Sequence, residues 1–305
     1  MSDLKKWQGC LMGLAVGDAV GASVEFKDRG TFKPVTDMNG GGPFNLPKGY
    51  YTDDTIMALC LADSLLYSDG FDPKDQMNRY VNWMDFGHRS PTGTCFDIGS
   101  TTYNALDDYK FRGNPYAGNT SNYSSGNGAI MRMAPIPMFF KTMDEVMLYS
   151  KQMSSTTHGS PFCLESAELF AIVIHLALKG YSKEYILEYV YTYIDKSQSI
   201  KSVATNVFKY GFHLKHVDDI KGSGFVLESL EASLWCFFNT DNYKDAVLKA
   251  TNLGDDTDTT AAITGQLAGA YYGIDDIPDK WVKTIYNYQE ILDISDRLFF
   301  KHENK

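Results

Sequence analysis

The sequence predicts an all-α protein folded as a single compact multi-helix domain, and three observations support this prediction. Apolar residues recur mainly at helical spacing, whereas alternating β-branched segments bounded by turn residues are nearly absent. The 305-residue chain is 44% hydrophobic and 22% charged, which is ample for a large buried core. No change in composition indicates a linker, so we expect residues 1–305 to form one domain.

Six segments have the clearest helical periodicity, namely residues 52–67, 161–179, 183–194, 224–238, 243–253 and 258–272. The stretch 162–178 is the most apolar, but it contains two glutamates and a histidine, so we expect a core helix and not a membrane span. Two other segments, 29–51 and 113–128, are rich in Gly, Pro, Asn and Ser. Each leads directly into a motif described below, so we expect loops that line a site.

A first helix is expected near the N-terminus, where four glycines recur every four residues: Gly9, Gly13, Gly17 and Gly21. Each glycine inside a helix costs roughly 0.8–1 kcal/mol relative to alanine, so this row loses on the order of 3–4 kcal/mol. Close approach of a second helix along the glycine row is the structural interpretation. A functional interpretation applies to Asp18 and Glu25, which lie among these small residues and just after them.

The net charge, the cysteines and the N-terminal residues argue against several classes of protein. The net charge of −10 disfavours nucleic-acid binding through a basic face and docking on anionic membranes. The five cysteines are scattered and form no C-x-x-C pair, so we expect reduced, mostly buried thiols. The N-terminal residues lack the apolar run and cleavage site of a signal peptide, so we expect a cytoplasmic protein.

Two acidic motifs carry the strongest chemical signal: YTDDT at residues 51–55 and GDDTDTT at residues 254–260. Each lies where a predicted helix begins. Helix capping is one explanation, because Thr52 is a suitable N-cap and an acid in the first turn stabilises a helix by about 0.3–1 kcal/mol. The second motif, however, has three Asp and three Thr in six positions, and carboxylates crowd in this way at little cost only when a cation neutralises them.

Hard divalent cations such as Mg²⁺ take oxygen ligands from carboxylates, hydroxyls and water. The two motifs would supply such ligands if the two helix starts converge. The candidate metal ligands are Thr52, Asp53, Asp54, Asp256, Asp258 and Thr259.

Five blocks then occur in a specific order along the chain: GCLMGLAVGDAVGASVEF, YTDDT, GNGAIMRMAP, THG and LGDDTDTTAAITGQLAGAYYG. With this set the chain resembles the ADP-ribosylglycohydrolase family, which includes the dinitrogenase reductase activating glycohydrolases, nearly from end to end. The resemblance implies an all-helical hydrolase with two Mg²⁺ or Mn²⁺ ions, held by the same six candidate ligands. Asp255 stands where many members have Gly, so we assign it no ligand role.

The resemblance also implies two candidate catalytic acids. Asp97, in CFDIGSTT, matches an acid near the metals, and Glu25 matches an acid close to metal and substrate. Either one is a candidate for moving the proton, while the metals orient ribose hydroxyls and water.

The remaining blocks imply residues that bind ADP-ribose. Gly126, Asn127 and Gly128 precede the run IMRM, so their N–H groups would hold a diphosphate at a helix start; an ordinary glycine-rich turn is the alternative. Arg132 would reach a phosphate or form an ion pair. His158 matches the active-site histidine of the family; the alternative is a capping or structural histidine, because Ser160-Pro161 indicates the start of the next helix.

Phe225 stands where relatives often have a tyrosine, so it would stack on the nucleotide without offering a hydroxyl; a core aromatic is the alternative. We therefore expect a metal-dependent hydrolase that cleaves ADP-ribose from a modified acceptor, with the N-glycosidic bond of ADP-ribosyl-arginine as the first choice. A hydrolase of O-linked or small-molecule ADP-ribose conjugates, and a non-catalytic ADP-ribose-binding protein, are the alternatives. We expect a monomer whose partner is an ADP-ribosylated protein or a small-molecule conjugate.

Overall fold

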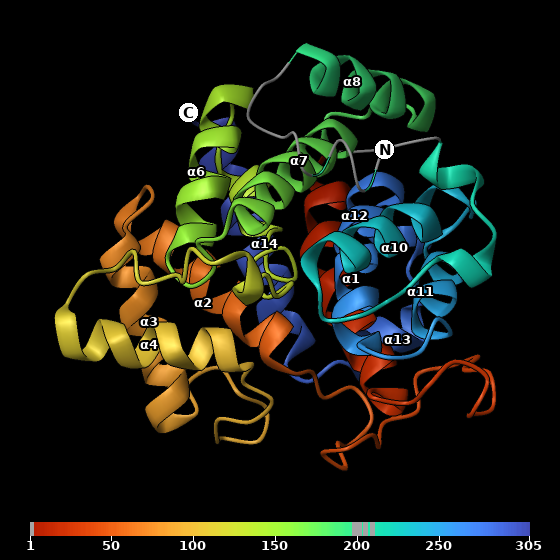
Figure 1. Ribbon diagram of the computed structural model, residues 1–305, viewed down its shortest axis with the longest axis horizontal. Coiled ribbons are helices and arrows are strands. Elements are labelled where there is room, and N and C mark those ends of the chain that lie inside the picture. The colour runs from red at the N-terminus through yellow and green to blue at the C-terminus, as the bar shows by residue number, and fades with distance from the viewer. Residues whose placement is uncertain (1–2, 197–202, 204–206, 208–210) are drawn as a thin grey trace.

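The computed structural model describes residues 3–196, 203, 207 and 211–305 (Figure 1). Within these residues the regular elements are α-helices and short 3-10 helices, and strand-like pairing is limited to isolated bridges. The predicted all-α fold class is therefore confirmed.

The α-helices follow one another in a chain of short and long elements. They are α1 (Asp3–Gly21), α2 (Asp53–Ser68), α3 (Pro73–Phe86), α4 (Ser100–Arg112), α5 (Pro135–Phe139), α6 (Met143–Ser155), α7 (Pro161–Leu178), α8 (Lys183–Lys196), α10 (Val226–Phe238), α11 (Tyr243–Thr251), α12 (Thr257–Tyr272), α13 (Asp279–Thr284) and α14 (Tyr288–Glu303). The six segments predicted from periodicity correspond to α2, α7, α8, α10, α11 and α12, with ends that agree to within two residues.

The predicted start of α7 is also confirmed. Ser160 is its N-cap residue and accepts a hydrogen bond from the Cys163 N–H at 3.2 Å, and Pro161 occupies the first helical position. Among the described helices, α7 alone is long and apolar enough to cross a membrane, but 78% of it is buried within the fold. This burial is what we expect of a core helix.

The core is built around α1 and α12, which lie side by side along their length (Figure 1) and pack more extensively than any other pair of described helices. A Cβ atom on any glycine of the predicted row would overlap a backbone carbonyl oxygen of α12; the facing pairs are Gly9–Gly269, Gly13–Gly265, Gly17–Ala261 and Gly21–Thr257. The glycine row therefore serves close helix approach, as the structural interpretation predicted.

The glycine row should be intolerant of even one methyl group. Gly17→Ala is expected to lower the free energy of unfolding by about 2–3 kcal/mol, because the new Cβ would overlap the backbone of α12 around Ala261. Gly70→Ala is the matched control, since a Cβ there meets only the Ser68 carbonyl oxygen at 3.9 Å. Urea unfolding of both variants measures the difference, and equal stability of the two would contradict this role of the glycine row.

Candidate active site and metal centre

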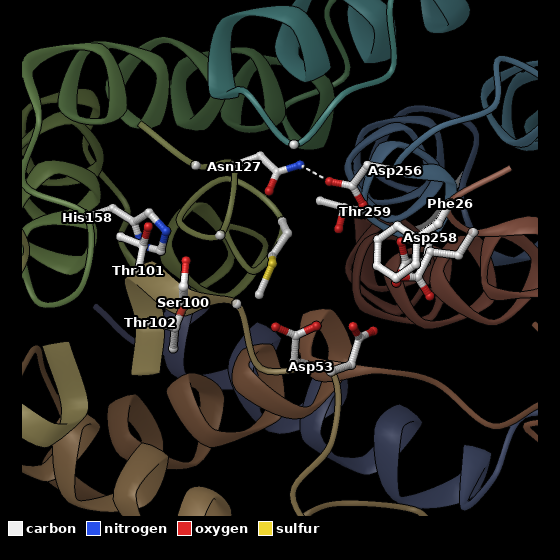
Figure 2. Close-up of a pocket in the computed structure, with 17 residues that line it drawn as sticks. Phe26, Asp53, Ser100, Thr101, Thr102, Asn127, His158, Asp256, Asp258 and Thr259 are labelled. Atoms are coloured by element: carbon white, nitrogen blue, oxygen red, sulfur yellow. Dashed lines mark hydrogen bonds between the residues drawn. The ribbon is translucent and has the colours of Figure 1, made fainter. Parts of the chain in front are cut away.

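A cavity of about 250 Å³ lies where the end of α1, the start of α2 and the start of α12 meet (Figure 2). Ten of the predicted site residues line this cavity: Glu25, Asp53, Asp97, Gly126, Asn127, Gly128, His158, Asp256, Asp258 and Thr259. The two acidic motifs, separated by about two hundred residues of sequence, therefore do converge at one place.

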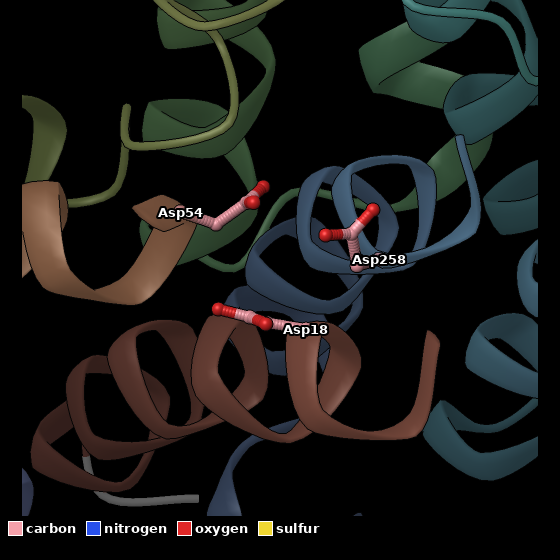
Figure 3. Close-up of side chains that lie close together, drawn as sticks. All are labelled: Asp18, Asp54 and Asp258. Carbon is pink, nitrogen blue, oxygen red and sulfur yellow. The ribbon is translucent and has the colours of Figure 1, made fainter. Parts of the chain in front are cut away.

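Three buried aspartates lie close together (Figure 3), and one of them, Asp258, lines the cavity. Asp18 comes from α1, Asp54 from the first turn of α2 and Asp258 from the first turn of α12, and one carboxylate oxygen of each lies within 4.8 Å of the others. A second group, Glu25, Asp97 and Asp258, meets the same distance limit. Asp258 thus belongs to both groups and connects them.

Thr52 does not cap α2 in the expected way. Its side chain makes no capping hydrogen bond. Its backbone N–H donates to Asp18 at 2.9 Å, and its hydroxyl lies 3.0 Å from Asp18, 3.2 Å from Asp54 and 3.3 Å from Asp258. Thr55 adds a hydroxyl donor at 2.6 Å and a backbone donor at 3.1 Å to Asp18. Thr52 is thus the N-cap residue of α2, as predicted, and acids occupy the first turn, but its hydroxyl contacts the acid cluster and makes no capping hydrogen bond.

The acid groups carry strongly displaced pKa values. Burial, together with the neighbouring acids, raises the pKa of Glu25 to about 8 and that of Asp97 to about 10. The same two causes hold the pKa values of Asp53, Asp54 and Asp258 well above the ordinary range. Such carboxyl groups ionise together at neutral pH only if positive charge is brought among them.

The unsatisfied oxygens of these acids identify the kind of ligand that fits. Glu25 Oε2, Asp54 Oδ1, Asp97 Oδ2 and Asp258 Oδ1 are buried without a hydrogen-bond partner. A carboxylate oxygen only accepts hydrogen bonds, and leaving it unpaired in the interior is costly. A divalent cation that prefers oxygen ligands fits this arrangement, so the acid cluster could bind metal.

The other predicted metal ligands lie around this cluster. Asp53 and Asp256 line the cavity but belong to neither group of acids in mutual contact. Asp256 instead accepts a hydrogen bond from the Asn127 side chain at 2.7 Å (Figure 2). The Thr259 hydroxyl lies 3.5 Å from Asp54 Oδ2.

Gly126, Asn127 and Gly128 form a wall of the cavity, but they do not precede a helix. Residues 128–132 form turns, and α5 begins only at Pro135. The Asn127 carbonyl accepts hydrogen bonds from residues 130 and 131, which closes a single turn that does not continue as a helix. The expected helix start at this loop is therefore wrong, and the glycine-rich turn, the alternative interpretation, is what the structure contains.

His158 and Arg132 differ in their access to the cavity. His158 lines it, and its Nδ1 lies 2.8 Å from the hydroxyl of Thr157. Burial lowers the pKa of His158 to about 3. Arg132 is fully buried and donates to the Gly128 carbonyl and to Thr157, so it reaches neither a phosphate nor a carboxylate through these bonds.

Phe225 does not line the cavity, although its neighbour Gly224 does. Phe225 is 37% exposed, and its ring packs edge-on against Phe162, with the ring centroids 5.9 Å apart. Stacking of Phe225 on a nucleotide stays a prediction. Residues 29–51, which lie between α1 and α2 in the sequence, do not line the cavity either, and Val35 is bonded to the Asn252 side chain.

Sequence reasoning missed several residues of the site. Asp18 was noted but given no partner, and its contacts with Thr52 and Thr55 arise only in the folded chain. Further lining residues are Phe26, Gly99, Ser100, Thr101, Thr102, Met131 and Gly224. Ser100, Thr101 and Thr102 end the block CFDIGSTT and form the first turn of α4, so the polar sequence GSTT after Asp97 was the available signal.

The structure is a helical fold with an acid-lined cavity whose acid cluster could bind metal, and comparison with known proteins identifies its class. The sequence matches the ADP-ribosylglycohydrolase family over residues 1–305. The chain belongs to this family and is a hydrolase that acts on glycosyl bonds of ADP-ribose.

The sequence is similar to named relatives over nearly the whole chain. This chain is 39% identical to the ADP-ribosylarginine hydrolase Tri1 of Serratia proteamaculans (strain 568), in an alignment that covers 97% of this chain and 80% of the relative. It is 40% identical to the Pseudomonas putida (strain GB-1) protein of the same name, covering 97% and 78%. A solved structure described as an ADP-ribosylglycohydrolase-related protein complex is 36% identical, with a TM-score of 0.86 over 98% of this chain and 99% of that chain.

Magnesium is expected to raise the melting temperature more at pH 8 than at pH 6. Because the pKa of Glu25 is raised to about 8, the cation-free folded chain keeps a proton that the unfolded chain releases near pH 4.5. This contribution to stability is lost as the pH rises through 8, whereas the cation binds more tightly as the carboxyl groups lose their protons. Thermal melting at both pH values, with MgCl₂ or with EDTA, measures the effect.

Asp258→Asn is the matched variant, because this residue belongs to both acid groups. It should abolish the magnesium-dependent rise at both pH values. A rise of equal size at pH 6 and pH 8, or one that survives this substitution, would show that the cation binds elsewhere.

Proposed function

We propose that this protein releases ADP-ribose from arginine side chains of ADP-ribosylated proteins, in a reaction that depends on two Mg²⁺ or Mn²⁺ ions. The observation that carries the proposal is the meeting of two acid groups at Asp258, directly at the wall of the cavity. A protein that only binds ADP-ribose would have no need to keep every one of these acids.

The arginine linkage is supported by the named relatives. Two proteins about 40% identical over 97% of this chain are called ADP-ribosylarginine hydrolases. Arginine also suits the charge of the site, because a guanidinium leaving group is cationic and the wall around Glu25, Asp97 and Asp256 is acidic. The acceptor would thus be attracted to the same side chains that perform the reaction.

Two cations are proposed because the acids form two groups that share one member. Asp18, Asp54 and Asp258 surround one position, with Thr52 beside them, and Glu25, Asp97 and Asp258 surround the other. Asp53, Asp256 and Thr259 complete the proposed ligand set from the cavity wall. When bound, the cations would orient ribose hydroxyls and lower the pKa of a bound water.

The protein's own side chains have the remaining tasks. Glu25 and Asp97 are proposed for proton transfer, because each lines the cavity and each has a buried oxygen without a hydrogen-bond partner, which is able to accept a proton from water. Asn127 ties the glycine-rich loop to Asp256 and so holds the wall that faces the substrate at a fixed distance from the acids.

Release of free ADP-ribose from arginine-modified protein tests the proposal directly. The unaltered enzyme should release it with Mg²⁺ and not with EDTA, and it should act much more slowly on serine-linked ADP-ribose. Asp256→Asn should lower kcat/KM by about 100-fold or more, because a metal ligand is lost. Chromatography of the released nucleotide measures each rate.

Asp255→Asn is the matched control for this experiment. Asp255 is exposed and adjacent to Asp256, and its positive φ of 67° is a conformation that asparagine tolerates, so activity should stay within about twofold. Release from serine-linked substrate alone would reject the arginine linkage. No release from either substrate would reject hydrolysis of both, and equal loss in the two variants would remove the ligand role of Asp256.

Glu25→Gln and Asp97→Asn should each lower kcat by about 100-fold or more, because each removes a proposed proton-transfer group. The stabilisation by Mg²⁺ at pH 8 separates their roles: the acid that moves the proton is the one whose replacement leaves this stabilisation in place. Steady-state kinetics and thermal melting of the same preparations give both results. Full turnover in either variant would remove that residue from the mechanism.

A further inference from the structure

His158 is held in one orientation between two parts of the chain. On one side its Nδ1 lies 2.8 Å from Oγ1 of Thr157. On the other side the ring packs against the glycine-rich loop, where a Cβ on Gly128 would come within 2.6 Å of Cε1 and 2.9 Å of Nε2. His158 lines the cavity (Figure 2), and its Nδ1 is bonded to Thr157, so Nε2 is the ring nitrogen that is left for a ligand.

The position of the proton in this hydrogen bond follows from Arg132. A guanidinium group only donates hydrogen bonds, and its Nη2 donates to Thr157 Oγ1 at 2.5 Å. Thr157 accepts that bond, and a second bond accepted from Nδ1–H would leave its own buried hydroxyl hydrogen without an acceptor among the hydrogen bonds of the described residues. The Thr157 hydroxyl therefore donates to Nδ1 of His158. A neutral imidazole carries one proton, so an accepting Nδ1 leaves the proton on Nε2. Burial, and after it the charge of Arg132, lowers the pKa of His158 to about 3, which keeps the ring neutral.

The hydrogen bonds of Arg132 go to neutral groups around His158. Its side chain is fully buried, donates to the Gly128 carbonyl as well as to Thr157, and lies over the ring of Tyr80 with 5.1 Å to the centroid. None of these partners is an acid, although burying a charge is costly unless it is paired. The two hydrogen bonds instead join the loop and the threonine that enclose His158.

We propose that Arg132 and Thr157 are positioning residues that hold His158 as its Nε2–H tautomer, so that the ring donates a hydrogen bond to an oxygen of bound ADP-ribose. The identity of the ligand rests on the proposed function. In this arrangement His158 is not the general base, because Nε2 has no free lone pair for a proton. Proton transfer is then left to the acids on the opposite wall.

Three substitutions of Thr157 test the tautomer. Thr157→Ser keeps the hydroxyl and should keep the Nε2–H form. Thr157→Val removes the donor and should allow both tautomers. Thr157→Asp places a carboxylate between Arg132 and Nδ1 and should invert the ring to the Nδ1–H form. Nitrogen-15 NMR of histidine-labelled, substrate-free protein reads the tautomer, and His158→Gln identifies the resonances.

Binding of ADP-ribose, measured by calorimetry on the same proteins, tests the donation to the ligand. Affinity in Thr157→Ser should stay within about twofold of the unaltered protein. Thr157→Asp should weaken binding by about tenfold or more, because an accepting Nε2 would then face an accepting oxygen. Arg132→Met should give mixed tautomers, because the Thr157 hydroxyl, no longer held by Arg132, can turn either to donate to Nδ1 or to accept from it.

An Nδ1–H ring in the unaltered protein, or nitrogen shifts that Thr157→Val leaves unchanged, would overturn the inference. So would inversion of the tautomer by Thr157→Asp without loss of affinity. Because the NMR experiment needs no substrate, it is separable from the proposed function. The predicted tautomer in a protein that leaves ADP-ribosyl-arginine intact would support the positioning and reject the arginine hydrolase; hydrolysis with an Nδ1–H ring would do the reverse.

Discussion

The close approach of α1 and α12 is the constraint on which the rest of the structure depends. Glycines on one or both helices let the two backbones touch, and nearly all of α12 and the second half of α1 are buried as a result. The same contact sets the site, because Asp18 lies near the end of α1 and Asp258 at the start of α12. A larger side chain in the row would therefore disturb the core and the acid cluster together. The helix propensity lost at the glycines, on the order of 3–4 kcal/mol, is offset by this burial.

The acid cluster adds a second constraint, which is electrostatic. Asp18 is satisfied by hydrogen-bond donors from Thr52 and Thr55, so it fixes the start of α2 beside α1. Asp54 and Asp258 each keep an oxygen without a partner, and this makes them suited to a cation. Asp18 thus organises the backbone and also borders the cation position that it shares with Asp54 and Asp258. Across the cavity, Arg132 places a permanent positive charge behind the loop and the histidine, where it organises neutral hydrogen-bond groups.

Periodicity was sufficient to locate α2, α7, α10 and α12, because each buries a continuous apolar face or nearly its whole surface. The ordered motifs were sufficient to bring ten residues to one cavity. The sequence did not predict contacts that form only when distant segments pack together. The role of Asp18 depends on donors more than thirty positions away. An arginine is usually exposed, so its residue type does not predict that Arg132 is buried. The residues after Gly128 have the composition of a helix, but the structure contains only a single turn there.

The central claim is that two acid groups sharing Asp258 bind two divalent cations at the wall of the cavity. The most direct test is a crystal structure of the protein grown with Mn²⁺, in which anomalous scattering locates the ions without reference to activity. The account predicts two peaks, each within bonding distance of Asp258, one on the Asp54 side and one on the side of Glu25 and Asp97. A single peak that does not touch Asp258, or no peak in the acid cluster at saturating Mn²⁺, would contradict it.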